Sequence, residues 1–128
     1  MIFVTLGTQK FQLNRLLKLL DDLCRTQKIK EEIFAQIGHS DYCPMHYNYI
    51  DLLDKELFEK KVKESSLVIS HGGAGSIMSA LKEDKPVIVF PRLRKYREHV
   101  DDHQLEIAGA LSKKKLFFYA EKMITYMT

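Results

Sequence analysis

Short apolar runs alternate along the chain with longer segments in which apolar residues recur every three or four positions. The runs, rich in β-branched residues, predict buried strands at residues 2–6, 33–37, 67–70, 86–91 and 116–119, with a shorter strand at 47–50. The three- and four-residue spacing predicts helices at about residues 11–26, 54–64, 76–83 and 99–111. Asp54 is placed to cap the second helix, with Leu57, Phe58 and Val62 expected on its apolar side.

Strands that alternate with helices predict an α/β fold, a Rossmann-like parallel sheet with helices on both faces. We expect a single domain over residues 1–128. Ligands of such folds bind outside the carboxyl ends of the strands. This rule selects the loops at residues 7–9, 38–40, 71–76 and 92–103.

Composition changes this picture little. The 20 Lys and Arg residues against 17 Asp and Glu give a net charge of +3, too small to indicate nucleic-acid binding. Cys24 and Cys43 lie far apart and outside any metal-ligand spacing, so neither a disulfide nor a metal site is expected. No apolar run approaches the roughly 20 residues of a membrane span, and no signal-peptide pattern follows Met1. We expect a cytoplasmic protein that reaches the cytoplasmic face of a membrane through a partner.

The segment His71-Gly72-Gly73-Ala74-Gly75-Ser76 lies between a predicted strand and a predicted helix. Its glycines allow a tight turn and let a ligand approach the backbone, and the N–H groups that open the helix suit a phosphate. Ser76 could cap the helix or donate its hydroxyl to a phosphate, and His71 could donate to a diphosphate. The segment is not a Walker A loop, because no lysine precedes Ser76, nor a GxGxxG fingerprint, because Met78 replaces the last glycine. A purely structural turn is the alternative.

A second polar cluster, residues 92–104, follows the next predicted strand. We expect it to face the glycine turn across the rim of the sheet, because the two loops follow successive strands. Asp101 and Asp102 could contact sugar hydroxyls or only stabilise the start of a helix. The four basic residues between Arg92 and Arg97 could attract a diphosphate or an anionic lipid surface, or form a solvated loop.

Three segments together resemble one family in order and spacing: Val4-Thr5-Leu6-Gly7-Thr8, then Ser70 with the glycine turn, then Pro91-Arg92 with Glu98-His99-Val100-Asp101-Asp102-His103-Gln104. The family is the C-terminal domain of GT-B glycosyltransferases of the MurG type (glycosyltransferase family 28, C-terminal). The likeness is nearest to free-standing members, such as the small subunit of the eukaryotic UDP-GlcNAc transferase of dolichol-linked glycan synthesis and capsule or exopolysaccharide subunits like PssE. It covers nearly the whole chain.

The resemblance implies one half of a GT-B enzyme that binds a UDP-sugar. The residues implicated in donor binding are Gly7, Thr8, His71, Gly72, Gly73, Ala74, Gly75, Ser76, Glu98, His99, Asp102, His103 and Gln104. The loop after His71 would hold the diphosphate, and the segment ending at Gln104 would contact the sugar. Ser79 stands where related enzymes often have the glutamate that binds the ribose, and Glu83, one turn further, could substitute for it.

The resemblance further implies inverting transfer of a hexose to a polyprenyl-diphosphate-linked sugar, with UDP as the leaving group. Because the chain has residues for only one of the two GT-B domains, a membrane-anchored partner subunit is expected to bind the acceptor. No cofactor or metal is expected, since backbone N–H groups can stabilise the charge on the β-phosphate and no DxD motif occurs. The sequence identifies neither the general base nor the sugar.

Two other hypotheses stay open from the sequence. Ser79 and the short segment after Tyr119 would also suit a non-catalytic binding or enhancer subunit of the same system. A nucleotide-binding enzyme of another class, such as a nucleotide-sugar epimerase, shares the architecture but would need a second domain.

Overall fold

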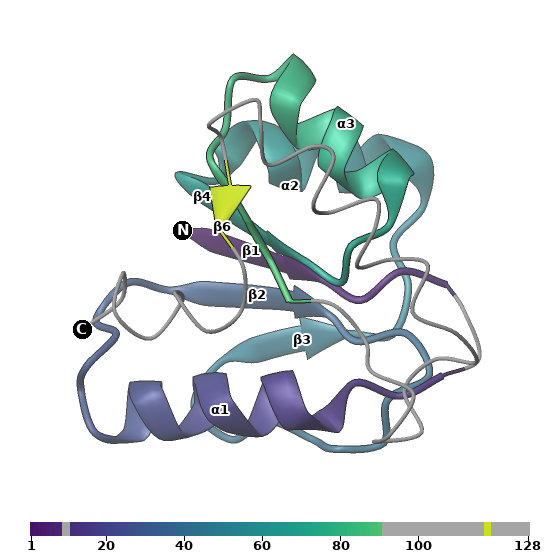
Figure 1. Cartoon of the computed structure of the whole chain (residues 1–128). Helices are drawn as coiled ribbons and strands as arrows, with labels where there is room; N and C mark the ends of the chain where they lie inside the picture. The colour runs from purple at the N-terminus through teal and green to yellow at the C-terminus, as the bar shows by residue number, and fades with distance from the viewer. Residues whose placement is uncertain (9–10, 91–116, 119–128) are drawn as a thin grey trace.

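The computed structural model describes residues 1–8, 11–90 and 117–118, which form a parallel sheet covered by helices (Figure 1). The strands are β1 (Ile2–Thr5), β2 (Ile33–Gln36), β3 (Asn48–Ile50), β4 (Leu67–Ser70), β5 (Val87–Val89) and β6 (Phe117–Phe118). They pair in the order β3-β2-β1-β4-β5-β6, every pair parallel. This is the order of doubly wound Rossmann-type sheets, so the predicted fold class is confirmed.

Helices cover both faces of the sheet, as predicted. Figure 1 shows α1 (Asn14–Arg25) on one side of the sheet and α2 (Lys55–Glu64) and α3 (Ala74–Lys82) on the other. Successive residues of β1 point to opposite faces: Ile2 and Val4 pack with the leucines of α1, whereas Phe3 packs with α2 and α3. Burial on both faces explains why the strands read as continuous apolar runs.

The first helix begins later than its apolar spacing predicts, at Asn14 instead of near residue 11. Groups outside the helix accept from the N–H groups at this end. Leu13 N donates to Ser40 Oγ at 2.9 Å, and Asn14 N donates to Gln12 Oε1 at 2.8 Å. The start of α1 is therefore fixed by a loop 27 residues away in the sequence as well as by its own residues.

The second helix begins where predicted. The Asp54 carboxylate accepts a hydrogen bond of 2.8 Å from Leu57 N, which makes it the N-cap of α2. The expectation that Leu57 shares the apolar side with Phe58 and Val62 is wrong, because Leu57 is 45% exposed and lies outside the core. Phe58 and Val62 are four residues apart and share the buried stripe, whereas Leu57 is turned about 100° away from Phe58 around the helix axis.

The structure describes some of the remaining predicted elements. The strands predicted at 86–91 and 116–119 correspond to β5 and β6, which pair in parallel. The helix predicted at 99–111 lies outside the described residues.

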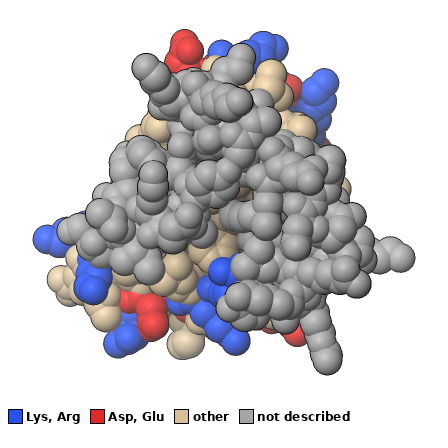
Figure 2. All heavy atoms as spheres, in the orientation of Figure 1, with Lys and Arg blue, Asp and Glu red and all other residues tan. Residues whose placement is uncertain are grey.

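Among the residues that are described, no helix is long and apolar enough to cross a bilayer. On the face shown in Figure 2, the described lysines and arginines are interspersed with aspartates and glutamates.

Candidate functional site

Two loops meet at the carboxyl edge of the sheet, because β1 and β4 are neighbours in space although 61 residues separate them along the chain. One loop follows β1 at Gly7-Thr8, and the other is the glycine turn after β4 (71–76). To its other side β1 pairs with β2, and strand order reverses between β1 and β4. Such a switch point is where doubly wound sheets bind their ligands. The structure thus brings together eight of the predicted site residues, Gly7, Thr8 and 71–76.

The His71 ring joins the two loops. The residue is 6% exposed, and its Nδ1 lies 3.3 Å from the backbone oxygen of Thr5. Because a carbonyl only accepts, Nδ1 holds the proton in this contact. A Cβ at Gly7 would lie 2.7 Å from the ring, and a Cβ at Gly73 would lie 2.4 Å from Nε2. His71 therefore packs between two positions that only glycine can fill without movement of the ring.

The start of α3 supplies backbone donors at this edge. Gly73 is extended (φ −70°, ψ 133°) and is the N-cap, so the helix begins at Ala74, two residues before the predicted start. Within the described residues, the N–H groups of Ala74, Gly75 and Ser76 donate to no protein atom. Three such groups, together with the positive end of the helix dipole, form an anion site.

Of the two alternative roles predicted for Ser76, that of helix cap is wrong, since Gly73 holds the N-cap position and Ser76 follows it by three residues. The Ser76 hydroxyl instead donates to Gly73 O at 3.1 Å. It also lies 2.9 Å from Ser70 Oγ, which accepts from Gly72 N at 3.1 Å. The two hydroxyls therefore link β4 to the turn and hold its shape. Phosphate contact by Ser76 stays a prediction.

A cleft of about 450 Å³ opens beside the turn, within the size range of small-molecule sites. The two loops form one wall, and the start of α2 forms the other. The polar lining residues Thr5, Gln36, Lys55 and Glu59 were not predicted as site residues. The sequence could have indicated Gln36 as a candidate site residue, because it is a polar residue in an otherwise apolar strand. It is 3% exposed, and its Oε1 accepts from Leu53 N at 2.9 Å.

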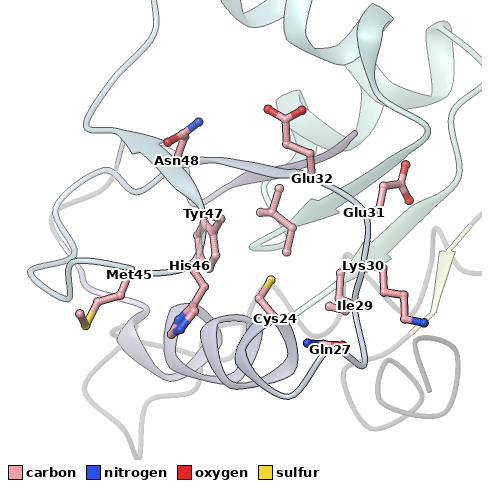
Figure 3. A pocket seen from close by; sticks show the side chains of 11 residues that line it. Cys24, Gln27, Ile29, Lys30, Glu31, Glu32, Met45, His46, Tyr47 and Asn48 are labelled. Carbon is pink, nitrogen blue, oxygen red and sulfur yellow. The ribbon is translucent and has the colours of Figure 1, made fainter.

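A larger cavity, of about 730 Å³, lies at the opposite end of the sheet, between the last turn of α1 and the amino ends of β2 and β3 (Figure 3). The charged ends of Lys30, Glu31 and Glu32 do not converge on its centre. His46 is already bound there, with Nδ1 2.9 Å from an oxygen of Asp21. Size alone does not make this cavity the site, because it is remote from the glycine turn and from the carboxyl edge.

The other half of the predicted site lies outside the described residues. It comprises Glu98, His99, Asp102, His103 and Gln104. Their roles therefore stay predictions. Within the described ranges, no three His, Cys, Asp or Glu side chains are grouped to hold a metal ion. The described part of the site offers backbone N–H groups, hydroxyls, Lys55 and Glu59 to a ligand.

Proteins of known structure share this fold. A glycotransferase of kitacinnamycin matches with a TM-score of 0.68 at 14% identity, over 91% of this chain and 29% of that one. The glycosyltransferase SnogD from Streptomyces nogalater matches with a TM-score of 0.57 at 20% identity, over 93% of this chain and 30% of its own. At such identities the likeness concerns the fold.

Sequence comparison is more specific. The human UDP-N-acetylglucosamine transferase subunit ALG13 is 31% identical over 127 residues, which is 92% of this chain and 11% of the human protein. The Mus musculus protein of that name is 28% identical over 134 residues, or 91% of this chain and 10% of the mouse protein. The chain thus spans about a tenth of the length of these relatives. The family model for the glycosyltransferase family 28 C-terminal domain matches residues 1–124. With nearly its whole length covered by that model, the chain belongs to the glycosyltransferase family 28 C-terminal domain family.

Proposed function

We propose that the chain is the UDP-sugar-binding subunit of a two-component inverting glycosyltransferase. The family supports sugar transfer, and the names of the human and mouse relatives favour N-acetylglucosamine as the transferred sugar. The proposed acceptor is a sugar on a polyprenyl diphosphate, in lipid-linked oligosaccharide, capsule or exopolysaccharide synthesis. A nucleoside diphosphate is the leaving group of this reaction, so the site has to hold and stabilise a diphosphate.

The observation that supports this function is the set of N–H groups at Ala74, Gly75 and Ser76. They open α3 at the switch point of the sheet and have no partner among the described residues. When the bond to the sugar breaks, negative charge grows on the β-phosphate. Donors already fixed by the helix can stabilise that charge without having to reorganise. The turn is itself held in shape by the Ser70 and Ser76 hydroxyls.

A partner is part of the proposal. The matching relatives are named as subunits of a transferase, and the family model is that of a C-terminal domain. A second, membrane-anchored polypeptide would bind the acceptor and close the cleft on the donor. We propose that this polypeptide holds the chain at the cytoplasmic face of the membrane.

Ligand-induced stabilisation tests the nucleotide preference. The chain is heated alone and with UDP, UDP-N-acetylglucosamine, ADP or NAD, and its melting temperature is recorded. A ligand at 100 times its dissociation constant adds about 2.7 kcal/mol to the free energy of unfolding, so binding is readily visible. We expect UDP and the UDP-sugar to stabilise the chain. Stronger stabilisation by ADP or NAD would assign the cleft to another class of nucleotide enzyme.

Replacing Ala74 by proline tests the helix start directly. Ala74 is the first helical residue, where proline is well tolerated, and Gly73 before it is extended, as a residue before proline prefers. The substitution removes one N–H donor and leaves the helix intact. We expect Ala74→Pro to weaken UDP binding about tenfold or more, since hydrogen bonds to charged groups are worth about 1.5–3 kcal/mol.

The matched control is Ala74→Ser, which keeps the N–H group. Titration calorimetry with UDP measures both variants, and thermal unfolding confirms that both are folded. Equal UDP affinity of the proline and serine variants would show that this helix start does not bind the diphosphate.

A further inference from the structure

The cleft continues from the glycine turn to a second wall built by α2. On this side Lys55, Phe58 and Glu59 line it, and Ser79 of α3 lines it as well. Glu59 and Ser79 also both line an adjoining hollow of about 400 Å³ between the two helices. The two residues therefore lie where the cleft meets this adjoining hollow.

Glu59 is the acidic side chain in this part of the cleft. The other described residues that line it include one lysine, Lys55, and one histidine, His71, and the rest carry no ionisable side chain. No described residue forms a hydrogen bond or an ion pair with the Glu59 carboxylate. Glu83, the alternative suggested by the sequence, lines the adjoining hollow and is not among the residues that line the cleft.

A carboxylate without a partner weakens the binding of a diphosphate beside it, because like charges repel. The repulsion is offset where the ligand donates hydrogen bonds to the carboxylate. A ribose offers two vicinal hydroxyls, and a carboxylate is the group that doubly wound folds use to accept from them. Lys55, one helical turn before Glu59, offsets part of the repulsion from the phosphates. The charge pattern of this wall thus suits a ribonucleoside next to a diphosphate.

We propose that Glu59 accepts hydrogen bonds from the ribose hydroxyls of the donor and makes the cleft selective for ribonucleotides. This inference rests on the proposed function. It assigns the ribose contact to α2, in the cleft that Ser79 also lines. Ser79 has only a hydroxyl to offer from α3, so the carboxylate comes from the neighbouring helix α2.

A comparison of ligands with and without the hydroxyl tests the assignment. Titration calorimetry measures UDP and 2′-deoxy-UDP on the full chain and on its Glu59→Gln variant. We expect the unaltered chain to prefer UDP about tenfold, the value of one hydrogen bond to a charged group. Glu59→Gln is expected to lose most of this preference, with UDP weakened and 2′-deoxy-UDP little changed or bound better.

Glu83→Gln and Glu56→Gln are the matched controls. Glu56 lies in α2, Glu83 is the C-cap residue of α3, and neither lines the cleft. Both should keep the preference for UDP. An unchanged preference in Glu59→Gln, or its loss in Glu83→Gln instead, would overturn the assignment. Absence of any UDP binding by the unaltered chain would contradict the proposed function itself, so the two failures are distinguishable.

Discussion

At the scale of single residues, glycine serves two purposes in the turn after β4. A Cβ at Gly73 would lie 2.4 Å from the buried His71 ring, whereas a Cβ at Gly75 would meet nothing within 4 Å. The ring cannot move aside easily, because Gly7 lies against it as well. Gly73 is therefore needed for packing, and Gly75 leaves an open approach to the backbone.

We expect Gly73→Ala to lower the free energy of unfolding by about 1–3 kcal/mol, the usual cost of overpacking a core. Its backbone angles are ordinary for alanine, so the loss comes from the contact with His71, less the small gain from a stiffer unfolded chain. Gly75→Ala should instead raise stability by up to about 1 kcal/mol, because alanine is the better helix former. Urea unfolding of both variants measures these changes.

The Gly73→Ala and Gly75→Ala variants also distinguish effects on stability from effects on UDP binding. Since Gly75 lines the cleft, its new methyl group should weaken UDP binding although the free protein becomes more stable. A stabilised Gly75→Ala variant with unchanged UDP affinity would mean that the ligand does not approach this backbone. A fully stable Gly73→Ala variant would mean that the His71 ring is free to shift.

At the scale of elements, local signals were sufficient where an element is determined by its own residues. Asp54 was predicted as a helix cap and is one, because the bond from Leu57 N spans three residues. The start of α1 could not be predicted, since it depends on Ser40, and only the fold brings that side chain to Leu13 N. The start of α3 was misplaced because Ser76, a good capping residue, lies three positions inside the helix.

Asp21 connects α1 to the loop that leads into β3. It is 5% exposed and accepts hydrogen bonds from the Tyr42 hydroxyl, at 2.5 Å, and from the N–H groups of Met45 and His46. Burial by itself would raise the pKa of this carboxyl, but these hydrogen bonds together hold it below its usual value. The same contact raises the pKa of Tyr42 to about 12.

We expect Asp21→Asn to lower the free energy of unfolding at pH 7 by about 1–3 kcal/mol, because buried donors lose a charged acceptor. Since the folded pKa lies below the unfolded value, the carboxylate stabilises the fold at neutral pH. That contribution is lost as the pH falls through the folded value. The difference between the two proteins should therefore shrink below about pH 4. Urea unfolding at several pH values checks this.

Asp22→Asn is the control for this prediction. Asp22 is the next residue in the same helix, is 69% exposed, and pairs with Arg25 on the surface. It should change stability little at any pH, since exposed pairs contribute about 0–1 kcal/mol. A constant difference between Asp21→Asn and the unaltered chain from pH 7 to pH 3 would show that the charge of Asp21 does not hold the loop.

At the scale of the whole molecule, the sequence predicted one wall of the site and missed the other. The glycine turn is a contiguous motif, so its place at the carboxyl edge followed from the alternation of strands and helices. The wall formed by Lys55 and Glu59 depends on which face of the sheet α2 covers and how it packs beside α3. Neither is encoded in a local motif, and charged residues on an exposed helix face give no signal of their own.

The loops after β1, β2 and β4 also support one another, and a substitution at their base should therefore act on the cleft at a distance. Gly38 follows β2 with a φ of +58°, and a Cβ there would lie 2.7 Å from the backbone oxygen of Gly7. We expect Gly38→Ala to cost about 1–2 kcal/mol from the left-handed backbone alone. Because the clash displaces the loop that carries Gly7, UDP binding should weaken at least threefold, although Gly38 does not line the cleft.

Ile29→Val is the control, because Ile29 is buried at the other end of the sheet. This variant should lose about 1 kcal/mol of stability and keep its UDP affinity. If calorimetry gave both variants the same UDP affinity, the stacked loops would not be what sets the shape of the cleft.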